Sequence, residues 1–174
     1  DYMIDEDATS TAQLIAKAEG VVCGIAVAKR VFELLDPACS FEILKEDGSR
    51  VVPGDVIARL SGKTRALLKG ERTALNLLQH LSGIATATRR LVDLVAGTRA
   101  VITDTRKTLP GLRALQKYAV TVGGGKNHRF NLSDGAMLKD NHIDLAGGIT
   151  QAVNNARAYL KAQNKNLLIE VETR

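Results

Sequence analysis

The second half of the sequence alternates between strand-like and helix-like segments, and this alternation restricts the fold more than any other feature. The expected strands are "AVITDT" (100–105), "GAMLKDN" (135–141) and "NLLIEVE" (166–172). The expected helices between them are "PGLRALQKYAV" (110–120) and "GGITQAVNNARAYLKAQ" (147–163). Strands that alternate with helices are typical of a parallel sheet, open or closed into a barrel. We therefore predict an α/β fold for this half.

The first half follows a different pattern. Residues 9–24 alternate in polarity, as a half-buried strand does, and residues 25–36 change to helical spacing. Asp47-Gly48 is a strong signal for a hairpin turn, and residues 56–60 alternate again. These segments predict a small α+β unit with an antiparallel sheet.

A long periodic segment, residues 70–96, separates the two patterns and predicts one long helix. Its apolar face consists of Leu75, Leu78, Leu81, Ile84, Thr88, Leu91 and Val95. Gly83 inside it indicates a bend or a close contact, and Gly97 is a natural stop. We predict an N-terminal α+β domain over residues 1–97, with this helix as its connector. Residues 98–174 are then the first three units of an α/β barrel.

Composition favours an anionic ligand. The 174 residues carry a net charge of +5, but aromatic residues make up only 3% and Trp is absent, which argues against a nucleic-acid partner. No apolar stretch is long enough to cross a membrane. Cys23 and Cys39 have no metal-ligand spacing and are expected to be reduced thiols of a cytoplasmic protein. The acidic start has no apolar core, so no signal peptide is expected there. Because the chain starts without Met and stops directly after a strand-like run, we expect a fragment or a processed chain.

Polar side chains lie near the carboxyl end of each expected barrel strand. They are Asp104, Arg106, Lys139, Asn141, Glu170 and Glu172. Alternate residues of a strand share a face, so these groups are expected to form a polar floor where barrel enzymes bind substrate. The alternative is a structural ion-pair network of Asp104, Lys139 and Glu170.

The segment "GGGKNHRF" (123–130) adds cationic groups. Its three glycines either hold an anion with their backbone N–H groups or simply end a helix. Arg129 offers a planar fork suited to carboxylate or phosphate, and it would act with Arg106, Lys107 and Lys139 on a multiply charged anion. His80 is expected to have a structural role. His142 could contribute to anion binding, but a structural or supporting role is expected for it.

Asp104 and Glu172 are the candidates for binding Mg²⁺ or sugar hydroxyls, because hard cations prefer oxygen ligands. The sequence has no catalytic triad, Walker A loop, HExxH motif or zinc spacing. The residues alone therefore predict a parallel α/β enzyme that binds a polyanion, together with Mg²⁺.

Four blocks of this sequence closely resemble the quinolinate phosphoribosyltransferase family. They are "ERTALNLLQHLSGIAT" (71–86), "DTRKTLPGLRALQKYAVTVGGGKNHR" (104–129), "LSDGAMLKDNH" (132–142) and "IEVE" (169–172). The resemblance implies an N-terminal α+β domain followed by an incomplete α/β barrel. It also implies that, with Mg²⁺, quinolinate and phosphoribosyl pyrophosphate give nicotinate mononucleotide, pyrophosphate and CO₂ in de novo NAD synthesis.

The same resemblance implies a set of site residues. They are Arg72, Thr105, Arg106, Lys107, His128, Arg129, Lys139 and Glu172. Most of them would surround the quinolinate carboxylates and the neighbouring phosphates. Lys139 and Glu172 are the catalytic members, and Glu172 would hold the ribose hydroxyls directly or through Mg²⁺. Arg72 would reach the active site of the other subunit of a homodimer, or of a higher oligomer.

Three alternatives remain at this level. The first is a paralogous phosphoribosyltransferase with another acceptor, such as nicotinate or that of the molybdenum-associated relative. The second is a non-catalytic anion-binding module, or a truncated chain that is catalytically incomplete because the later barrel strands are absent. The third and weakest is a basic nucleic-acid binder.

Overall fold

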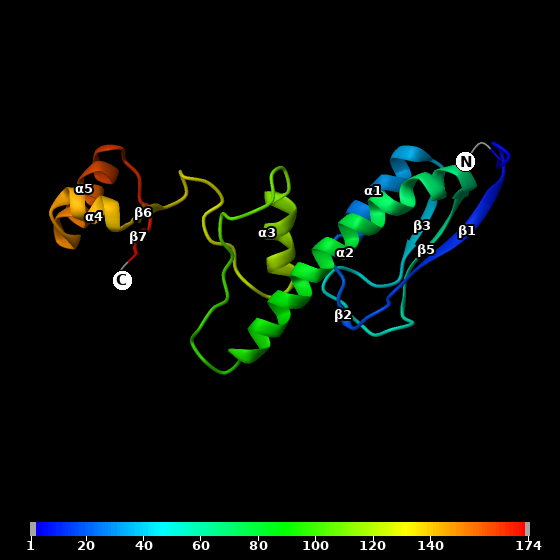
Figure 1. The fold of residues 1–174 in the computed structure, drawn as a ribbon, viewed down its shortest axis with the longest axis horizontal. Coiled ribbons are helices and arrows are strands. Elements are labelled where there is room, and N and C mark those ends of the chain that lie inside the picture. Colours follow the sequence, from blue (N-terminus) through cyan, green and yellow to red (C-terminus); the bar gives the residue numbers. More distant parts are fainter. Residues whose placement is uncertain (1–2, 173–174) are drawn as a thin grey trace. The chain divides into compact units, whose positions relative to one another are not determined.

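The computed structural model describes residues 3–172, and the chain divides into two compact units, Asp1–Asn127 and His128–Arg174 (Figure 1). The first unit contains the antiparallel strands and the long helix, and the second contains the parallel strand pair. Within residues 3–172, no helix is both long and apolar enough to cross a membrane.

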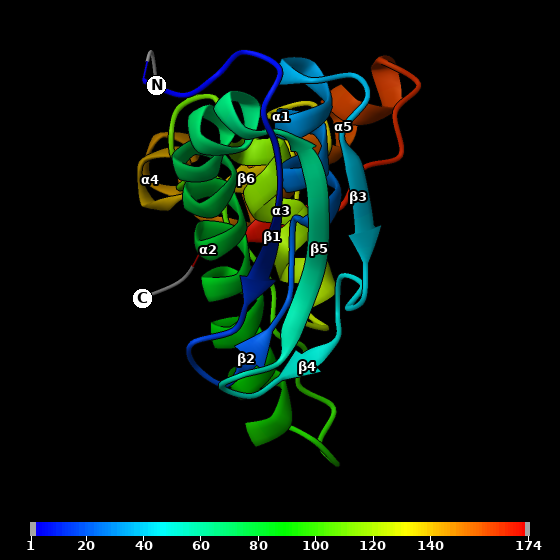
Figure 2. The same ribbon diagram turned by 90° about the vertical axis from the view of Figure 1, so that its right-hand side faces the viewer.

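The first unit has a three-stranded antiparallel sheet in the order β1 (Thr9–Ile15), β5 (Val56–Lys63) and β3 (Ser40–Ile43) (Figure 2). Ala58 and Leu60 of the central strand are buried, as their alternation predicts. The predicted strand over residues 9–24 is too long. It ends at Ile15 after a register shift, and Ala18 is exposed.

The turn at Asp47-Gly48 exists, with Gly48 at φ +91°, but the predicted hairpin is wrong. Strand β3 before the turn pairs with β5, whereas β4 (Arg50–Val51) after it pairs with β2 (Gly20–Val21). The turn therefore passes the chain from one sheet to another.

Helix α1 (Ile25–Leu35) forms where the spacing predicts it, with Ile25, Ala28 and Phe32 buried. The N-cap residue of α1 is Gly24, which has no side chain to cap the helix. Instead, Oδ1 of Asp47 accepts hydrogen bonds from the backbone N–H groups of Gly24 (2.9 Å) and Ile25 (3.0 Å). A carboxylate from a distant turn thus satisfies the first donors of the helix.

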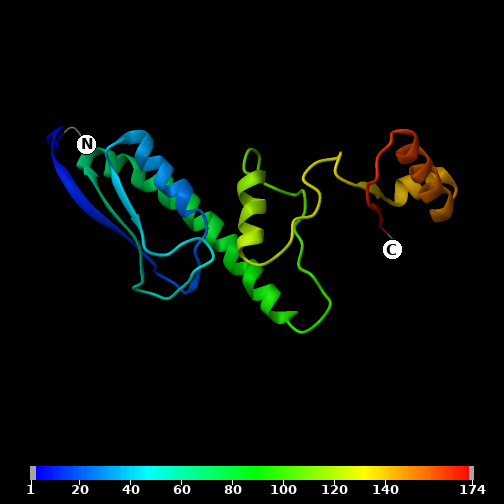
Figure 3. The same ribbon diagram turned by 180° about the vertical axis from the view of Figure 1, so that it is seen from behind.

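Helix α2 (Thr64–Leu94) is the predicted long helix, but it begins earlier than residue 70. Helices α1 and α3 (Arg113–Val122) both pack against it (Figure 3). Leu78, Leu81 and Thr88 of its predicted apolar face are buried, whereas Leu91 is 50% exposed. The predicted close contact at Gly83 is not found within the described chain, because a Cβ there would meet no atom within 4 Å.

The expected strand "AVITDT" is reduced to one isolated parallel bridge between Thr103 and Lys126. Helix α3 follows at Arg113, so Pro110 lies before the helix rather than in its first turn. Backbone pairing here stops at Asp104, whose N–H donates to the carbonyl of Lys126 at 3.2 Å.

The second unit pairs β6 (Ala136–Leu138) with β7 (Ile169–Val171) in parallel, and α5 (Ile149–Ala162) connects them. This strand, helix and strand confirm the predicted α/β class. Helix α4 (Asp140–Ala146) was not predicted, and it places Asn141 in a helix and not on a strand face. The described residues form no closed barrel.

Candidate anion-binding site

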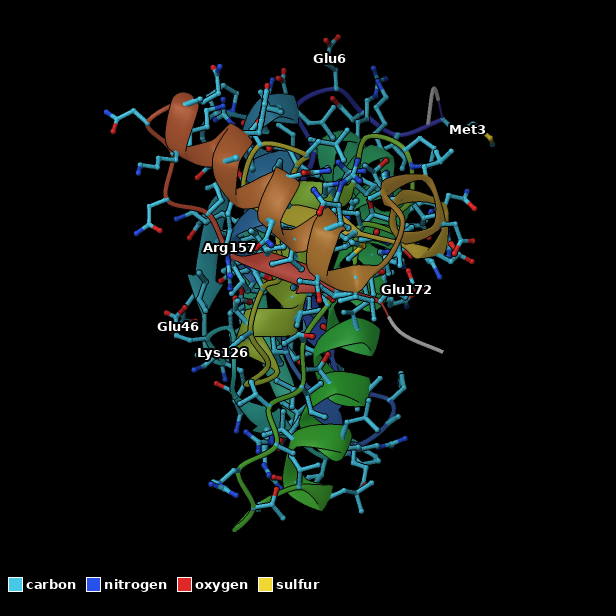
Figure 4. All side chains as sticks on the ribbon, turned by 90° about the vertical axis from the view of Figure 1, so that its left-hand side faces the viewer. Met3, Glu6, Glu46, Lys126, Arg157 and Glu172 are labelled. Atoms are coloured by element: carbon cyan, nitrogen blue, oxygen red, sulfur yellow. The ribbon has the colours of Figure 1, made fainter. Side chains whose placement is uncertain are left out.

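Lys139 and Glu172 directly follow the carboxyl ends of the two parallel strands (Glu172 is labelled in Figure 4). The strands end in register, with Leu138 opposite Val171, and the N–H of Glu172 donates to the carbonyl of Leu138 at 2.9 Å. The side chains then meet, with Lys139 Nζ 3.3 Å from Glu172 Oε2. Parallel pairing therefore places a cation and a carboxylate side by side at the carboxyl ends of these two strands. The third strand expected to contribute to the polar floor, "AVITDT", does not form.

Both side chains of this pair are more than half exposed, so they are accessible to a ligand. His142 fixes the backbone beneath them. Its Nδ1 accepts a hydrogen bond of 3.0 Å from the backbone N–H of Lys139 at the start of α4. This contact agrees with the structural role expected for His142.

His128 and Arg129 contact the same parallel pair. His128 Nε2 lies 2.7 Å from Oε2 of Glu170 on β7. The Arg129 guanidinium donates to the carbonyl of Gly135 (3.4 Å) and to Sδ of Met137 (3.1 Å) on β6. The second unit thus brings together four of the predicted site residues: His128, Arg129, Lys139 and Glu172.

Thr105, Arg106 and Lys107 belong to the first unit, in an irregular segment between the bridge at Thr103 and helix α3. Thr105 and Lys107 line a pocket of about 200 Å³, and Oγ1 of Thr105 accepts the backbone N–H of Lys107 at 3.1 Å. Nε of Arg106 is buried and has no hydrogen-bond partner within residues 3–172. A buried donor of this kind is uncommon unless another group satisfies it.

The predicted ion-pair network of Asp104, Lys139 and Glu170 is wrong in its pairing. Asp104 pairs with Lys117 of α3 at 2.6 Å, and the side chains are only 7% and 2% exposed, respectively. Glu170 pairs with His128 instead. Lys117 was not singled out from the sequence, because nothing in the local pattern shows that this lysine is buried against a carboxylate.

The three glycines at 123–125 end helix α3 and do not form an anion cradle. Their backbone N–H groups donate to carbonyls of α3, those of Ala119, Thr121 and Val120. A Cβ on Gly123 would lie 2.5 Å from the carbonyl oxygen of Ala85 on α2. These residues therefore allow close packing of α3 on α2.

Arg72 is exposed on α2, and its guanidinium makes no hydrogen bond or ion pair within the described part of the chain. An apolar pocket of about 460 Å³ lies between α2 and β1, lined by Leu14, Leu68 and Leu75, among others. Within the described residues, Arg72 therefore has no side-chain partner that would fix its guanidinium.

Taken together, the fold and these side chains define the class: an α/β protein with cationic groups at the carboxyl ends of parallel strands, beside a carboxylate. Residues 84–174 match the C-terminal domain of quinolinate phosphoribosyl transferase, and residues 1–82 match its N-terminal domain. The chain belongs to the quinolinate phosphoribosyl transferase family.

Its relatives carry related names. The chain is 49% identical to a probable nicotinate-nucleotide pyrophosphorylase (carboxylating) of Synechocystis sp., over 93% of this chain and 54% of the relative. It is also 49% identical to the protein of that name in Bacillus subtilis, over 93% of this chain and 56% of the relative. The crystal structure of NadC from Streptococcus pyogenes matches with a TM-score of 0.94 and 45% identity, over 100% of this chain and 61% of that one. The chain therefore spans about half the length of the curated relatives it matches.

Proposed function

We propose that the complete protein is a quinolinate phosphoribosyltransferase. It converts quinolinate and phosphoribosyl pyrophosphate into nicotinate mononucleotide, pyrophosphate and CO₂. The observation that carries this proposal is the pairing of Lys139 with Glu172 at the ends of β6 and β7, with Arg129 and His128 beside the same strands. One substrate has two carboxylates and the other has a phosphate and a pyrophosphate, so a cationic site with one carboxylate for sugar hydroxyls suits both.

The chemistry asks the protein for position and charge rather than for a covalent intermediate. The bond from the ribose C1 to pyrophosphate breaks, and the ring nitrogen of quinolinate forms a new bond to that carbon. The positive ring then stabilises the electron pair left when the adjacent carboxylate departs as CO₂, and a proton takes its place. Lys139 and Arg129 would hold carboxylates and phosphates at the ends of β6 and β7. In the first unit, Arg106, Thr105 and Lys107 would bind anionic groups of the substrates.

Glu172 would hold the ribose hydroxyls, directly or through Mg²⁺. Within residues 3–172 no group of three His, Cys, Asp or Glu side chains could bind a metal ion. Mg²⁺ is usually bound through one or two carboxylates together with substrate phosphates, and Glu172 could supply one such carboxylate. When bound, the ion would neutralise charge on the leaving pyrophosphate.

We also propose a homodimer in which Arg72 enters the neighbouring subunit's site. Two features support it. Arg72 has no partner in its own described chain, and the apolar pocket between α2 and β1 leaves Leu68 and Leu75 without full cover. A buried contact with a second copy would cover them.

We place the protein in the cytoplasm, which the two free cysteines favour.

The test is product formation by the complete protein with Mg²⁺, phosphoribosyl pyrophosphate and either quinolinate or nicotinate. We expect mononucleotide from quinolinate alone, with one CO₂ released for each product molecule. Product from nicotinate alone, or a folded dimer that is inactive with both, would contradict the proposal and favour a relative with another acceptor.

A further inference from the structure

A carboxylate is buried immediately before the segment Thr105–Lys107. This is Asp104, and its Oδ1 lies 2.6 Å from Nζ of the buried Lys117. The amide of Asn127, oriented to satisfy its neighbours, donates to Oδ2 of Asp104 at 2.7 Å and to the carbonyl of Lys117 at 2.9 Å. Asp104 is therefore held on both carboxylate oxygens.

The backbone at this point is held as well. Lys126 donates its N–H to the carbonyl of Ile102 at 2.9 Å and accepts the N–H of Asp104 at 3.2 Å. Beyond Asp104 this pairing stops, and Thr105–Lys107 continue without regular structure. The position of those three residues therefore depends partly on Asp104 and partly on Arg113 of α3, whose guanidinium donates to the carbonyl of Arg106 at 3.4 Å.

The charges suggest why a lysine stands at position 117. Lys117 lines the same pocket of about 200 Å³ as Thr105 and Lys107. An uncompensated carboxylate at that pocket would repel an anion, and the Lys117 ammonium cancels it. A buried ion pair is often no more stabilising than apolar groups of the same volume, so stability alone does not explain this pair.

We infer that Lys117 is a positioning residue for anion binding. Through Asp104, and together with Asn127, it holds Thr105–Lys107 in place and neutralises the buried carboxylate next to them. The identity of the anion rests on the proposed function.

The experiment compares the complete wild-type protein with Lys117→Met, Asp104→Asn and the double variant. Lys117→Met alone leaves the buried carboxylate of Asp104 without its cationic partner, so we expect this variant to be the least stable of the three. The double variant has neither charge, so we expect its Tm to lie within about 4 °C of the wild type. Lys161→Met, at an exposed lysine of α5, is the matched control.

The activity readout separates positioning from folding. We expect the folded double variant to show a KM for quinolinate raised about 10-fold or more, since small displacements of binding groups are costly. A double variant that folds and has the wild-type KM would show that the pair is only structural, and would overturn the inference.

A second readout does not require activity. Trypsin cleaves after Arg106 and Lys107, and we expect cleavage at these two bonds to be about 10-fold faster in the double variant, because a looser segment opens more often. Unchanged cleavage would overturn the inference even if KM changed. If the wild type has no activity but cleavage does accelerate in the double variant, the proposed function fails and the positioning of the segment stands.

Discussion

Lys139 illustrates how exposure separates function from stability at the scale of one residue. Its ion pair with Glu172 is solvent-exposed, and such pairs contribute about 1 kcal/mol or less to folding. Lys139→Ala is therefore expected to lower the free energy of unfolding by no more than that. If Lys139 stabilises charge in the transition state, kcat should fall by about 10²-fold or more.

The measurements for Lys139→Ala are urea unfolding and steady-state kinetics on the complete protein. Lys161→Ala removes an exposed lysine of the same unit and should change neither quantity appreciably. A loss of activity that merely follows the loss of folded protein would remove Lys139 from the catalytic set.

Tyr118 is a second residue with a measurable signature. Its hydroxyl donates to Oδ2 of Asp47 at 2.8 Å. Burial, and then this hydrogen bond and the Asp47 charge, raise the pKa of Tyr118 to about 12. Because the folded pKa lies above that of the unfolded chain, about 10, the contribution to stability is complete below pH 10 and disappears as the pH rises toward 12.

Tyr118→Phe should thus cost about 1 kcal/mol or less at pH 8, since the ring is partly exposed. The difference between variant and wild type should shrink as the pH rises from 10 to 12. Urea unfolding at pH 8 and pH 11 measures it. A difference that stays constant over this range would show that Tyr118 does not titrate as described.

At the scale of elements, glycines decide how helices pack. Gly123 lets α3 end against α2, and an added Cβ would meet the backbone oxygen of Ala85 at 2.5 Å. We expect Gly123→Ala to destabilise the protein by about 1–3 kcal/mol, because neither backbone can yield easily. Urea unfolding gives the value.

Gly83→Ala is the matched control within α2. No atom lies within 4 Å of its Cβ position, and alanine favours a helix over glycine by up to about 1 kcal/mol. This variant should therefore be as stable as the wild type or more stable. Equal destabilisation by the two changes would mean that the contact at Gly123 is not what costs stability.

Sequence patterns predicted the helices and strands themselves better than they predicted which elements pair or pack together. The alternation in β5 and the spacing in α1 identified both elements, because local periodicity determines which face is apolar. The turn at Asp47-Gly48 was recognisable, but not that it separates two sheets or that Asp47 caps α1. Pairing partners depend on segments distant in the sequence, which periodicity does not report.

At the scale of the whole molecule, the proposed dimer predicts complementation between inactive variants. Arg72→Ala and Lys139→Ala should each be inactive as homodimers. If Arg72 acts in the neighbouring site, a mixed dimer contains one intact site, and an equal mixture after subunit exchange should regain about a quarter of wild-type activity. No recovery, with exchange confirmed by mass spectrometry of differently labelled subunits, would place Arg72 in its own subunit's site or outside the site.

The domain boundary predicted at residue 97 stays a prediction. The two compact units divide between Asn127 and His128, whereas the two family matches divide near residue 83. The roles of the eight site residues are also predictions for the complete protein, since the relatives are about twice as long as this chain.

The sequence by itself determined the α/β class, the long helix and the cationic groups that follow the strands, since each depends on local periodicity or on the order of residues along the chain. Only the tertiary structure decided that Asp104 pairs with Lys117, that Glu170 pairs with His128 and that the glycines at 123–125 pack on α2. A charged side chain pairs with the partner that the packing of distant segments brings within reach, and neighbouring residues in the sequence do not reveal that partner.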